Sequence, residues 1–148
     1  MAIPALNSNG LLPPGIHGAT LEEIRLRFGS FQASDRRVQL FKRLEQLVVE
    51  LRRSGRFAAL VVDGSFVTAK PAPEDVDVIV VLHRDHDWTA DLGPSDYALV
   101  SRPLLRRKFG FDVLLAAEGG ADHERYVEFF GRVREDASMR KGMLRIKL

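Results

Sequence analysis

Three aspartates stand at the beginnings of two apolar segments, where carboxylates can bind a divalent cation. Asp75 and Asp77 lie at the entrance of residues 76–82 (VDVIVVL), and Asp112 lies near the start of residues 111–115 (FDVLL). Both segments have the short, apolar composition of buried strands. Side chains two residues apart in a strand point to the same face, so Asp75 and Asp77 are expected on one face. If the two strands are neighbours, all three carboxylates converge.

A cluster of this kind needs charge compensation. Two ionised carboxylates about 4 Å apart repel each other by roughly 4 kcal/mol at an effective dielectric constant of about 20. Either protons or cations must therefore offset the repulsion. Oxygen-only ligands favour Mg²⁺ or Mn²⁺, with water and phosphate oxygens completing the octahedron. The alternative is that these acids are solvated at the strand ends, because acidic side chains are seldom fully buried.

A phosphate-binding turn is predicted just upstream of the acids. Residues 57–63 (FAALVVD) form a third apolar run, which ends at Gly64 and Ser65. Glycine allows a ligand to approach the main chain closely, and N–H groups together with a hydroxyl suit phosphate oxygens. Lys70, the only cation in residues 66–74, could reach the same phosphate. An ordinary strand-to-loop turn with a solvated lysine is the alternative.

Together these residues resemble the motif of the nucleotidyltransferase superfamily that contains DNA polymerase beta. That motif is Gly-Ser, a spacer, two acids separated by one residue, and a later acid inside a hydrophobic strand. The chain also resembles small, poorly characterised prokaryotic members, including toxin-antitoxin nucleotidyltransferases, over nearly its whole length. It departs from the toxin-antitoxin members in lacking a Gly and an Arg between Gly-Ser and the acids. The residues that match the motif are Gly64, Ser65, Asp75, Asp77 and Asp112.

The resemblance implies transfer of a nucleoside monophosphate from a nucleoside triphosphate (NTP) to an acceptor hydroxyl on RNA or protein. Asp75 and Asp77 would hold the NTP-bound metal, and the Gly64 turn would bind the outer phosphates. Asp112 would complete a second metal site or act as a base. Two cations would then stabilise the attacking and leaving oxygens of an in-line displacement. The resemblance also implies a partner protein, in a toxin-antitoxin or defence setting.

Two other functions are compatible with the sequence. One is a catalytically idle nucleotidyltransferase-like module that binds a partner, for example as an antitoxin, although retention of all three acids argues against it. The other is an RNA-binding domain that uses the basic cluster Arg102, Arg106, Arg107 and Lys108. Such a domain would bind in a strongly salt-dependent manner and would be indifferent to Asp75→Asn.

Composition predicts one domain, residues 1–148, in the cytoplasm. The 148 residues carry 22 basic and 20 acidic side chains, and a net charge of +2 creates no field that requires a nucleic-acid partner. No apolar run reaches the length of a membrane helix, and the first residues lack a signal-peptide pattern. The absence of cysteine excludes disulfides and thiolate metal sites.

The predicted fold class is α/β (α+β), a small mixed and twisted sheet with helices on one side and the acids at one edge. Residues 1–12 are expected to form a loose N-terminal arm. Tyr126, Phe129 and Phe130 are expected to face the core from a short helix. The other expected elements are a helix from a capping box at residues 20–23 to residue 28, a helix from residue 34 or 35 to 54, a helix over 94–108 interrupted at Pro103, a helix over 122–130, and an edge strand at the C-terminal end, 142–148.

Overall fold

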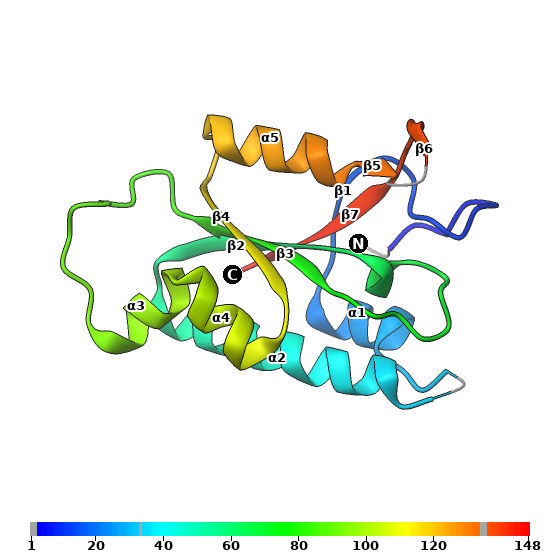
Figure 1. The fold of residues 1–148 in the computed structure, drawn as a ribbon, viewed down its shortest axis with the longest axis horizontal. Helices are drawn as coiled ribbons and strands as arrows, with labels where there is room; N and C mark the ends of the chain where they lie inside the picture. The colour runs from blue at the N-terminus through cyan, green and yellow to red at the C-terminus, as the bar shows by residue number, and fades with distance from the viewer. Residues whose placement is uncertain (1–2, 33, 134–135) are drawn as a thin grey trace.

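A mixed five-stranded sheet forms the centre of the computed structural model, which describes residues 3–32, 34–133 and 136–148. The strand order is β1-β7-β2-β3-β4 (Figure 1). β1 and β7 are parallel, as are β3 and β4, whereas β2 is antiparallel to both of its neighbours. This mixed sheet confirms the predicted fold class. The strands are β1 (Gly15–Gly18), β2 (Phe57–Asp63), β3 (Asp77–Leu82), β4 (Asp112–Ala117) and β7 (Gly142–Lys147).

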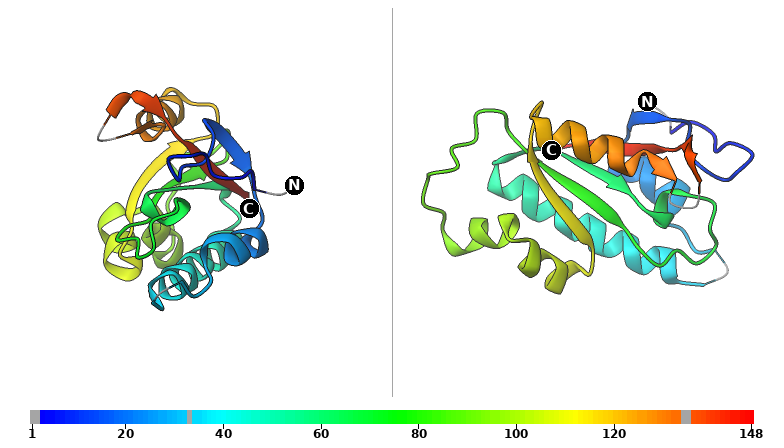
Figure 2. Two further views of the ribbon diagram at one scale, coloured as in Figure 1. Left: turned by 90° about the vertical axis from the view of Figure 1, so that its right-hand side faces the viewer. Right: turned by 45° about the horizontal axis from the view of Figure 1, so that its top comes forward.

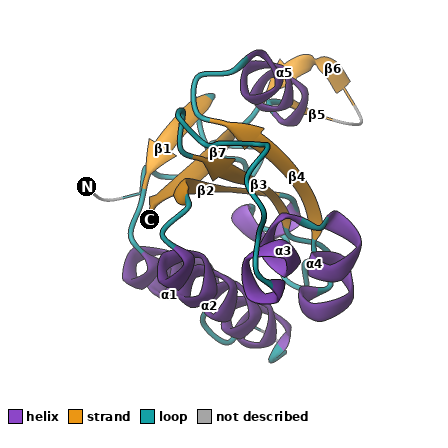
Figure 3. Cartoon of the chain, turned by 90° about the vertical axis from the view of Figure 1, so that its left-hand side faces the viewer, coloured by secondary structure: helices purple, strands orange, loops and turns teal. Residues whose placement is uncertain are grey.

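Helices cover both faces of this sheet, not one face as predicted. α1 to α4 lie on one side and α5 lies on the other (Figures 1, 2 and 3). A small ribbon of β5 (Arg132–Val133) and β6 (Asp136–Arg140) follows α5. The helices are α1 (Leu21–Phe28), α2 (Arg36–Ser54), α3 (Pro94–Val100), α4 (Arg102–Phe109) and α5 (Ala121–Phe130), and the 3-10 helix η1 (Ser65–Val67) follows β2.

The central strands are apolar on both faces because each face has its own core. Val78 and Val80 pack in the large core that contains the α2 stripe, whereas Ile79 and Val81 pack in a second core beneath α5. Double-sided burial explains why β3 reads as a continuous apolar run and does not alternate. The predicted α2 stripe is confirmed as buried: Leu40, Leu44, Leu47 and Leu51.

Two predictions about helix boundaries, a capping box at Thr20 and an interruption at Pro103, are confirmed. Thr20 accepts a hydrogen bond from the Glu23 N–H and the Glu23 side chain accepts one from the Thr20 N–H, so the capping box opens α1. The segment predicted to break at Pro103 is divided into α3 and α4. Ser101 caps α4, and Pro103 lies in its first turn, where its missing N–H costs no helical hydrogen bond.

The terminal segments differ from the predictions. Ile3 and Leu12 are buried in the large core, and Arg27 donates hydrogen bonds to the Ile3 and Pro4 carbonyls. Residues 3–12 are therefore attached to the domain, which corrects the prediction of a loose arm for this part, whereas residues 1–2 lie outside the described residues. β7 lies between β1 and β2, and is therefore not an edge strand. None of the helices in the described part of the chain combines the length and the apolar character of a membrane span.

Candidate active site

Three aspartates occupy the same level of three adjacent strands. Asp77 is in register with Asp63 across the antiparallel pair β2 and β3, and with Asp112 across the parallel pair β3 and β4. Neighbouring strands lie about 4.8 Å apart, so the three residues form a row across the sheet. Side chains alternate, and Ile79, two residues after Asp77, belongs to the core beneath α5. The row therefore faces the α5 side, and the predicted convergence of Asp77 with Asp112 is present.

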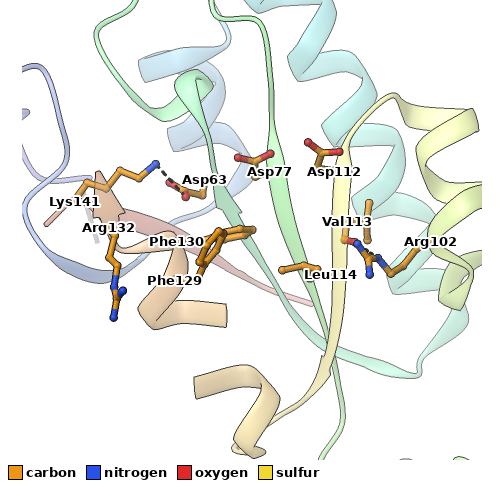
Figure 4. A pocket seen from close by; sticks show the side chains of 10 residues that line it. All are labelled: Asp63, Asp77, Arg102, Asp112, Val113, Leu114, Phe129, Phe130, Arg132 and Lys141. Atoms are coloured by element: carbon orange, nitrogen blue, oxygen red, sulfur yellow. Dashed lines mark hydrogen bonds and ion pairs between the residues drawn. The ribbon is translucent and has the colours of Figure 1, made fainter. Parts of the chain in front are cut away.

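A cavity of about 400 Å³ opens above this row (Figure 4). The carboxylates of Asp77 and Asp112 point in the same direction, while that of Asp63 points toward Lys141 (Figure 4). We call this space the rim cavity. Its lining consists of Asp63, Asp77, Arg102, Asp112, Val113, Leu114, Phe129, Phe130, Arg132 and Lys141.

The turn at Gly64 is built for close backbone approach. Gly64 has a φ of +90°, and a Cβ there would lie 3.0 Å from the Asp77 nitrogen and 3.1 Å from the Asp75 oxygen. Any side chain at this position would push the turn away from the strand that carries Asp77. The sequence requirement for glycine is thus steric as well as conformational.

Ser65 and Asp75 hold each other across the turn. The Ser65 N–H and hydroxyl donate to Asp75 Oδ1 at 3.1 and 2.6 Å, and the Glu74 N–H donates to the Ser65 hydroxyl at 3.2 Å. These donors were expected to be open to phosphate, but in this structure they position the first acid. β3 begins at Asp77, so Asp75 lies two residues before the strand.

A second cavity of about 300 Å³ lies at this turn, and we call it the turn cavity. It shares Asp77 and Lys141 with the rim cavity, whereas Asp112 lines only the rim cavity of these two. Asp77 is therefore the predicted acid common to both spaces. The lining of the turn cavity includes every other predicted residue: Gly64, Ser65, Lys70 and Asp75, together with Leu11, Thr68, Glu74 and Val133.

Asp63 and Lys141 form an ion pair that local sequence patterns did not reveal. Lys141 Nζ lies 3.2 Å from Asp63 Oδ2, and the two side chains are 18% and 1% exposed. Burial raises the pKa of Asp63, and the nearby Lys141 ammonium opposes this effect. The pairing of β7 with β2 brings Lys141 here from the far end of the chain. The one sequence feature that could have indicated a role for Asp63 is its position at the end of a strand, directly before Gly64.

Arg37 fixes the loop that follows the turn. Its guanidinium is buried, and it donates to the carbonyls of Phe66 (2.6 Å), Thr68 (2.7 Å) and Lys70 (2.5 Å), as well as to Phe28 in α1 (3.2 Å). Burial lowers the pKa of Arg37, although an arginine stays charged in proteins. Four carbonyls thus accept hydrogen bonds from one arginine, and no local sequence pattern predicts this role for Arg37.

The far side of the same loop is held by the adjacent arginine of α2. Arg36 donates to the carbonyls of Pro73 (3.0 Å) and Glu74 (2.7 Å). The first turn of α2 consequently anchors the loop at both ends, from η1 to the residue before Asp75. This anchoring gives a long, proline-containing loop a defined path beside the acids.

Burial, together with nearby negative charge, raises the pKa of Asp77 to about 6. Burial is the largest cause, followed by the charges of Asp75, Asp63 and Asp112, while Lys141 acts in the opposite direction. At neutral pH the Asp77 carboxylate is ionised, although burial and the neighbouring carboxylates disfavour its charge. The site therefore has an electrostatic demand for positive charge that its own side chains do not fully meet.

A surface arginine, Arg106, supplies positive charge to Asp112. Arg106 lies 2.9 Å from Asp112 Oδ1, and the side chains are 73% and 60% exposed, so water weakens the pair. As the side chains stand, the described residues contain no group of three His, Cys, Asp or Glu placed to hold one metal ion. For Asp77 and Asp112 to coordinate one metal ion together, the Asp112 side chain would have to rotate away from Arg106 and toward Asp77.

Asp77→Asn is expected to stabilise the metal-free protein above pH 6 by about 1 kcal/mol, or roughly 2–4 °C in melting temperature. The folded protein keeps a proton on Asp77 up to about pH 6, whereas the ordinary value is 3.8. Folding therefore takes up a proton between these values, and the stability of the native protein falls as pH rises through this window. Thermal melts in EDTA at pH 4.5 and 8 check this.

The gain from the substitution should be largest at pH 8 and much smaller at pH 4.5, where folded Asp77 is protonated and only part of the proton uptake on folding remains. Asp91→Asn, at an exposed position outside the two cavities, is the control and should change neither melt. An equal effect of Asp77→Asn at both pH values would show that charge repulsion at Asp77 is not the cause.

Residues 4–147 match the family model DUF6932, which is described as a family of unknown function. Neither the curated proteins nor the solved structures gave a match. The family match covers the turn, the site aspartates and the two arginines that hold the loop, so every element of the site lies within the matched region. These residues are Asp63, Asp75, Asp77, Asp112, Arg36 and Arg37.

Proposed function

The chain belongs to the DUF6932 family, and we propose that it is a metal-dependent nucleotidyltransferase, which moves a nucleoside monophosphate from an NTP to an acceptor hydroxyl and releases pyrophosphate. The acceptor oxygen would form a bond to the α-phosphorus as the bond from this phosphorus to the α,β-bridging oxygen breaks. The observation that carries this proposal is the register of Asp77 with Asp112 directly beside the Gly64 turn. Carboxylates on neighbouring strands and a sterically required glycine turn are what metal-assisted phosphoryl chemistry uses. The cytoplasm is the compartment that fits this substrate.

The donor set suits a hard cation. Asp75, Asp77 and Asp112 offer only oxygen atoms. The raised pKa of Asp77 reflects burial first and the neighbouring carboxylates second, and a cation would offset the repulsion from these carboxylates. Asp77 and Asp112, with Asp75 beside the turn, would hold Mg²⁺ or Mn²⁺. The ion would supply charge neutralisation at the transferred phosphoryl group and a lowered pKa for the attacking hydroxyl.

The protein's own residues then have distinct tasks. The Gly64 turn, fixed by Arg37, lets the triphosphate approach the main chain. Lys141, held by Asp63 and lining both cavities, provides the fixed cation for phosphate oxygens. Asp112 accepts the proton of the acceptor hydroxyl, or positions it, from the rim cavity. Positioning and electrostatic stabilisation contribute most of the catalysis in this reaction class.

The experiment that tests this function is incubation of the protein with cell lysate and each α-labelled NTP, with Mg²⁺ or Mn²⁺. Label transferred to RNA or to protein, and lost with EDTA, is the expected result. Label from every NTP remaining in the free nucleotide fraction with both metals would contradict it. The same reaction also identifies the base and the acceptor.

A catalytically idle binding module is the second candidate, and the ion pairs favour it. Lys141 with Asp63, and Arg106 with Asp112, already compensate two of the carboxylates without a metal. Such a module would bind a partner protein through this face and would need no nucleotide. Calorimetric titration with ATP and GTP, with and without Mg²⁺, separates the two, because the idle module would give no metal-dependent nucleotide binding.

Lys141→Met is expected to weaken Mg·ATP binding by about 2 kcal/mol, or roughly thirtyfold, the scale of a hydrogen bond to a charged group. Lys70→Met is the matched control. Lys70 is exposed and forms no ion pair with any of the described residues, so its loss is expected to change affinity by less than about threefold. Calorimetry at constant ionic strength measures both.

Removing Lys141 leaves the buried Asp63 charge without its partner, so the test is repeated in the Asp63→Asn, Lys141→Met double variant. The double variant should fold as the wild type does and should still bind Mg·ATP weakly. Equal losses in Lys70→Met and Lys141→Met, or recovery of ATP affinity in the double variant, would remove Lys141 from this role.

A further inference from the structure

The rim cavity has an aromatic wall that the chemistry above does not use. Phe129 is 68% exposed, which contradicts the prediction that it faces the core, whereas Tyr126 and Phe130 pack against the core beneath α5. The Phe129 ring lies 5.9 Å from the Phe130 ring, and both line the cavity above the aspartate row (Figure 4). A large aromatic side chain is thus presented to solvent beside the reacting centre.

Two arginines line the same cavity. Arg102 Nε donates to the Val113 carbonyl at 2.7 Å, which holds its guanidinium beside β4, and Arg132 lies at the other end of the cavity next to Phe129 (Figure 4). The Arg132 side chain is 55% exposed and its contact with Glu128 is long, at 3.3 Å, so it remains available to an anion. The cavity therefore combines a flat apolar surface with two separated cations.

In-line displacement determines which reactant this cavity receives. The attacking oxygen and the leaving group lie on opposite sides of the phosphorus. With the triphosphate at the turn cavity, the acceptor must come from the opposite side of Asp77, which is the rim cavity. Asp112 lines the rim cavity and is thereby placed beside the acceptor.

We propose that the rim cavity binds the acceptor, and that the acceptor is the end of a single-stranded RNA, with one base stacked on Phe129 and its phosphates at Arg102 and Arg132. This inference rests on the proposed function and adds its acceptor class. Single-stranded RNA is recognised by aromatic rings that stack unpaired bases and by cations along the backbone. A hydroxyl on a protein side chain would use neither the exposed ring nor the pair of arginines.

The test measures anisotropy of a short, fluorescein-labelled single-stranded RNA in Mg²⁺ without NTP, so that no transfer occurs. Phe129→Ala is expected to weaken RNA binding by about 10- to 100-fold, whereas Phe129→Trp retains it. The matched control is Phe31→Ala, because Phe31 is also 68% exposed but lies outside the rim cavity. Arg132→Gln should weaken binding and lower the salt dependence by about one phosphate contact.

Mg·ATP titrations on the same proteins separate this inference from the proposed function. Phe129→Ala should bind Mg·ATP as the wild type does. Three results would overturn the acceptor assignment and leave the transferase proposal in place. The first is wild-type protein that binds Mg·ATP but no RNA. The others are RNA binding that is equal in Phe129→Ala and Phe31→Ala, and a loss of ATP affinity in Phe129→Ala. Absence of Mg·ATP binding in the wild type would instead reject the transferase proposal.

Discussion

Asp77→Asn is expected to lower the proposed nucleotidyl transfer by about a thousandfold or more. Asp77 is the predicted acid that lines both the turn cavity and the rim cavity, so under this proposal its carboxylate would serve the triphosphate and the acceptor together. Removing one charge that stabilises a transferred phosphoryl group commonly costs at least two to three orders of magnitude in rate. The measurement is single-turnover transfer of α-labelled nucleotide at saturating protein.

The expected rise in the melting temperature of Asp77→Asn separates lost chemistry from lost structure. Asp112→Asn should also reduce transfer strongly, because it shares the rim cavity, and exposed Asp91→Asn should keep the wild-type rate. Transfer by Asp77→Asn within tenfold of the wild type would remove this residue from the reaction.

Arg37→Met lowers the free energy of unfolding by about 3 kcal/mol, or roughly 6–12 °C in melting temperature. Methionine fills most of the buried volume but donates no hydrogen bond. It would remove the arginine donor from the carbonyls of Phe28 and Phe66, where the hydrogen bonds are buried. The carbonyls of Thr68 and Lys70, where the bonds are partly buried, would lose it as well. Each unsatisfied buried acceptor costs about 1–3 kcal/mol, part of which local rearrangement recovers.

The same substitution should loosen the loop before it unfolds the domain. Hydrogen exchange at residues 66–70 is expected to rise more than exchange in β2, and Mg·ATP affinity should fall with it. Arg36→Met, which removes donors to only Pro73 and Glu74, is the matched control and should cost about 1 kcal/mol. Identical melting curves for Arg37→Met and the wild type would show that the arginine does not stabilise the loop.

Local patterns were sufficient for much of the fold. The apolar stripe and Gly55 define α2, and continuous apolar runs define β2 and β3, because each depends on residues that are close in the sequence. The glycines of β1 gave no strand pattern. Their pairing with β7 depends on the rest of the sheet, and it converts an apparent edge strand into an internal one.

The site was predictable only in part. The types and spacing of Gly64, Asp75 and Asp77 are local, and the register of Asp77 with Asp112 confirms that two of the acids converge. Asp63 with Lys141 and Arg37 with its carbonyls join segments far apart in the chain, and their role comes from burial that spacing does not encode. Phe129 was assigned to the core because aromatic residues on a short amphipathic helix usually face it. Its place at the end of α5 puts it over the cavity.

Binding of Mn²⁺ measured by electron paramagnetic resonance tests the central claim most directly. Titration is carried out without nucleotide, because a triphosphate would itself bind Mn²⁺, on the wild type, Asp77→Asn, Asp112→Asn and the Asp91→Asn control. The expected result is loss of the free Mn²⁺ signal with the wild type and the control, and its retention with Asp77→Asn and, to a lesser degree, with Asp112→Asn. The same Mn²⁺ binding in all four proteins, or none in the wild type, would contradict a metal site at this row of aspartates.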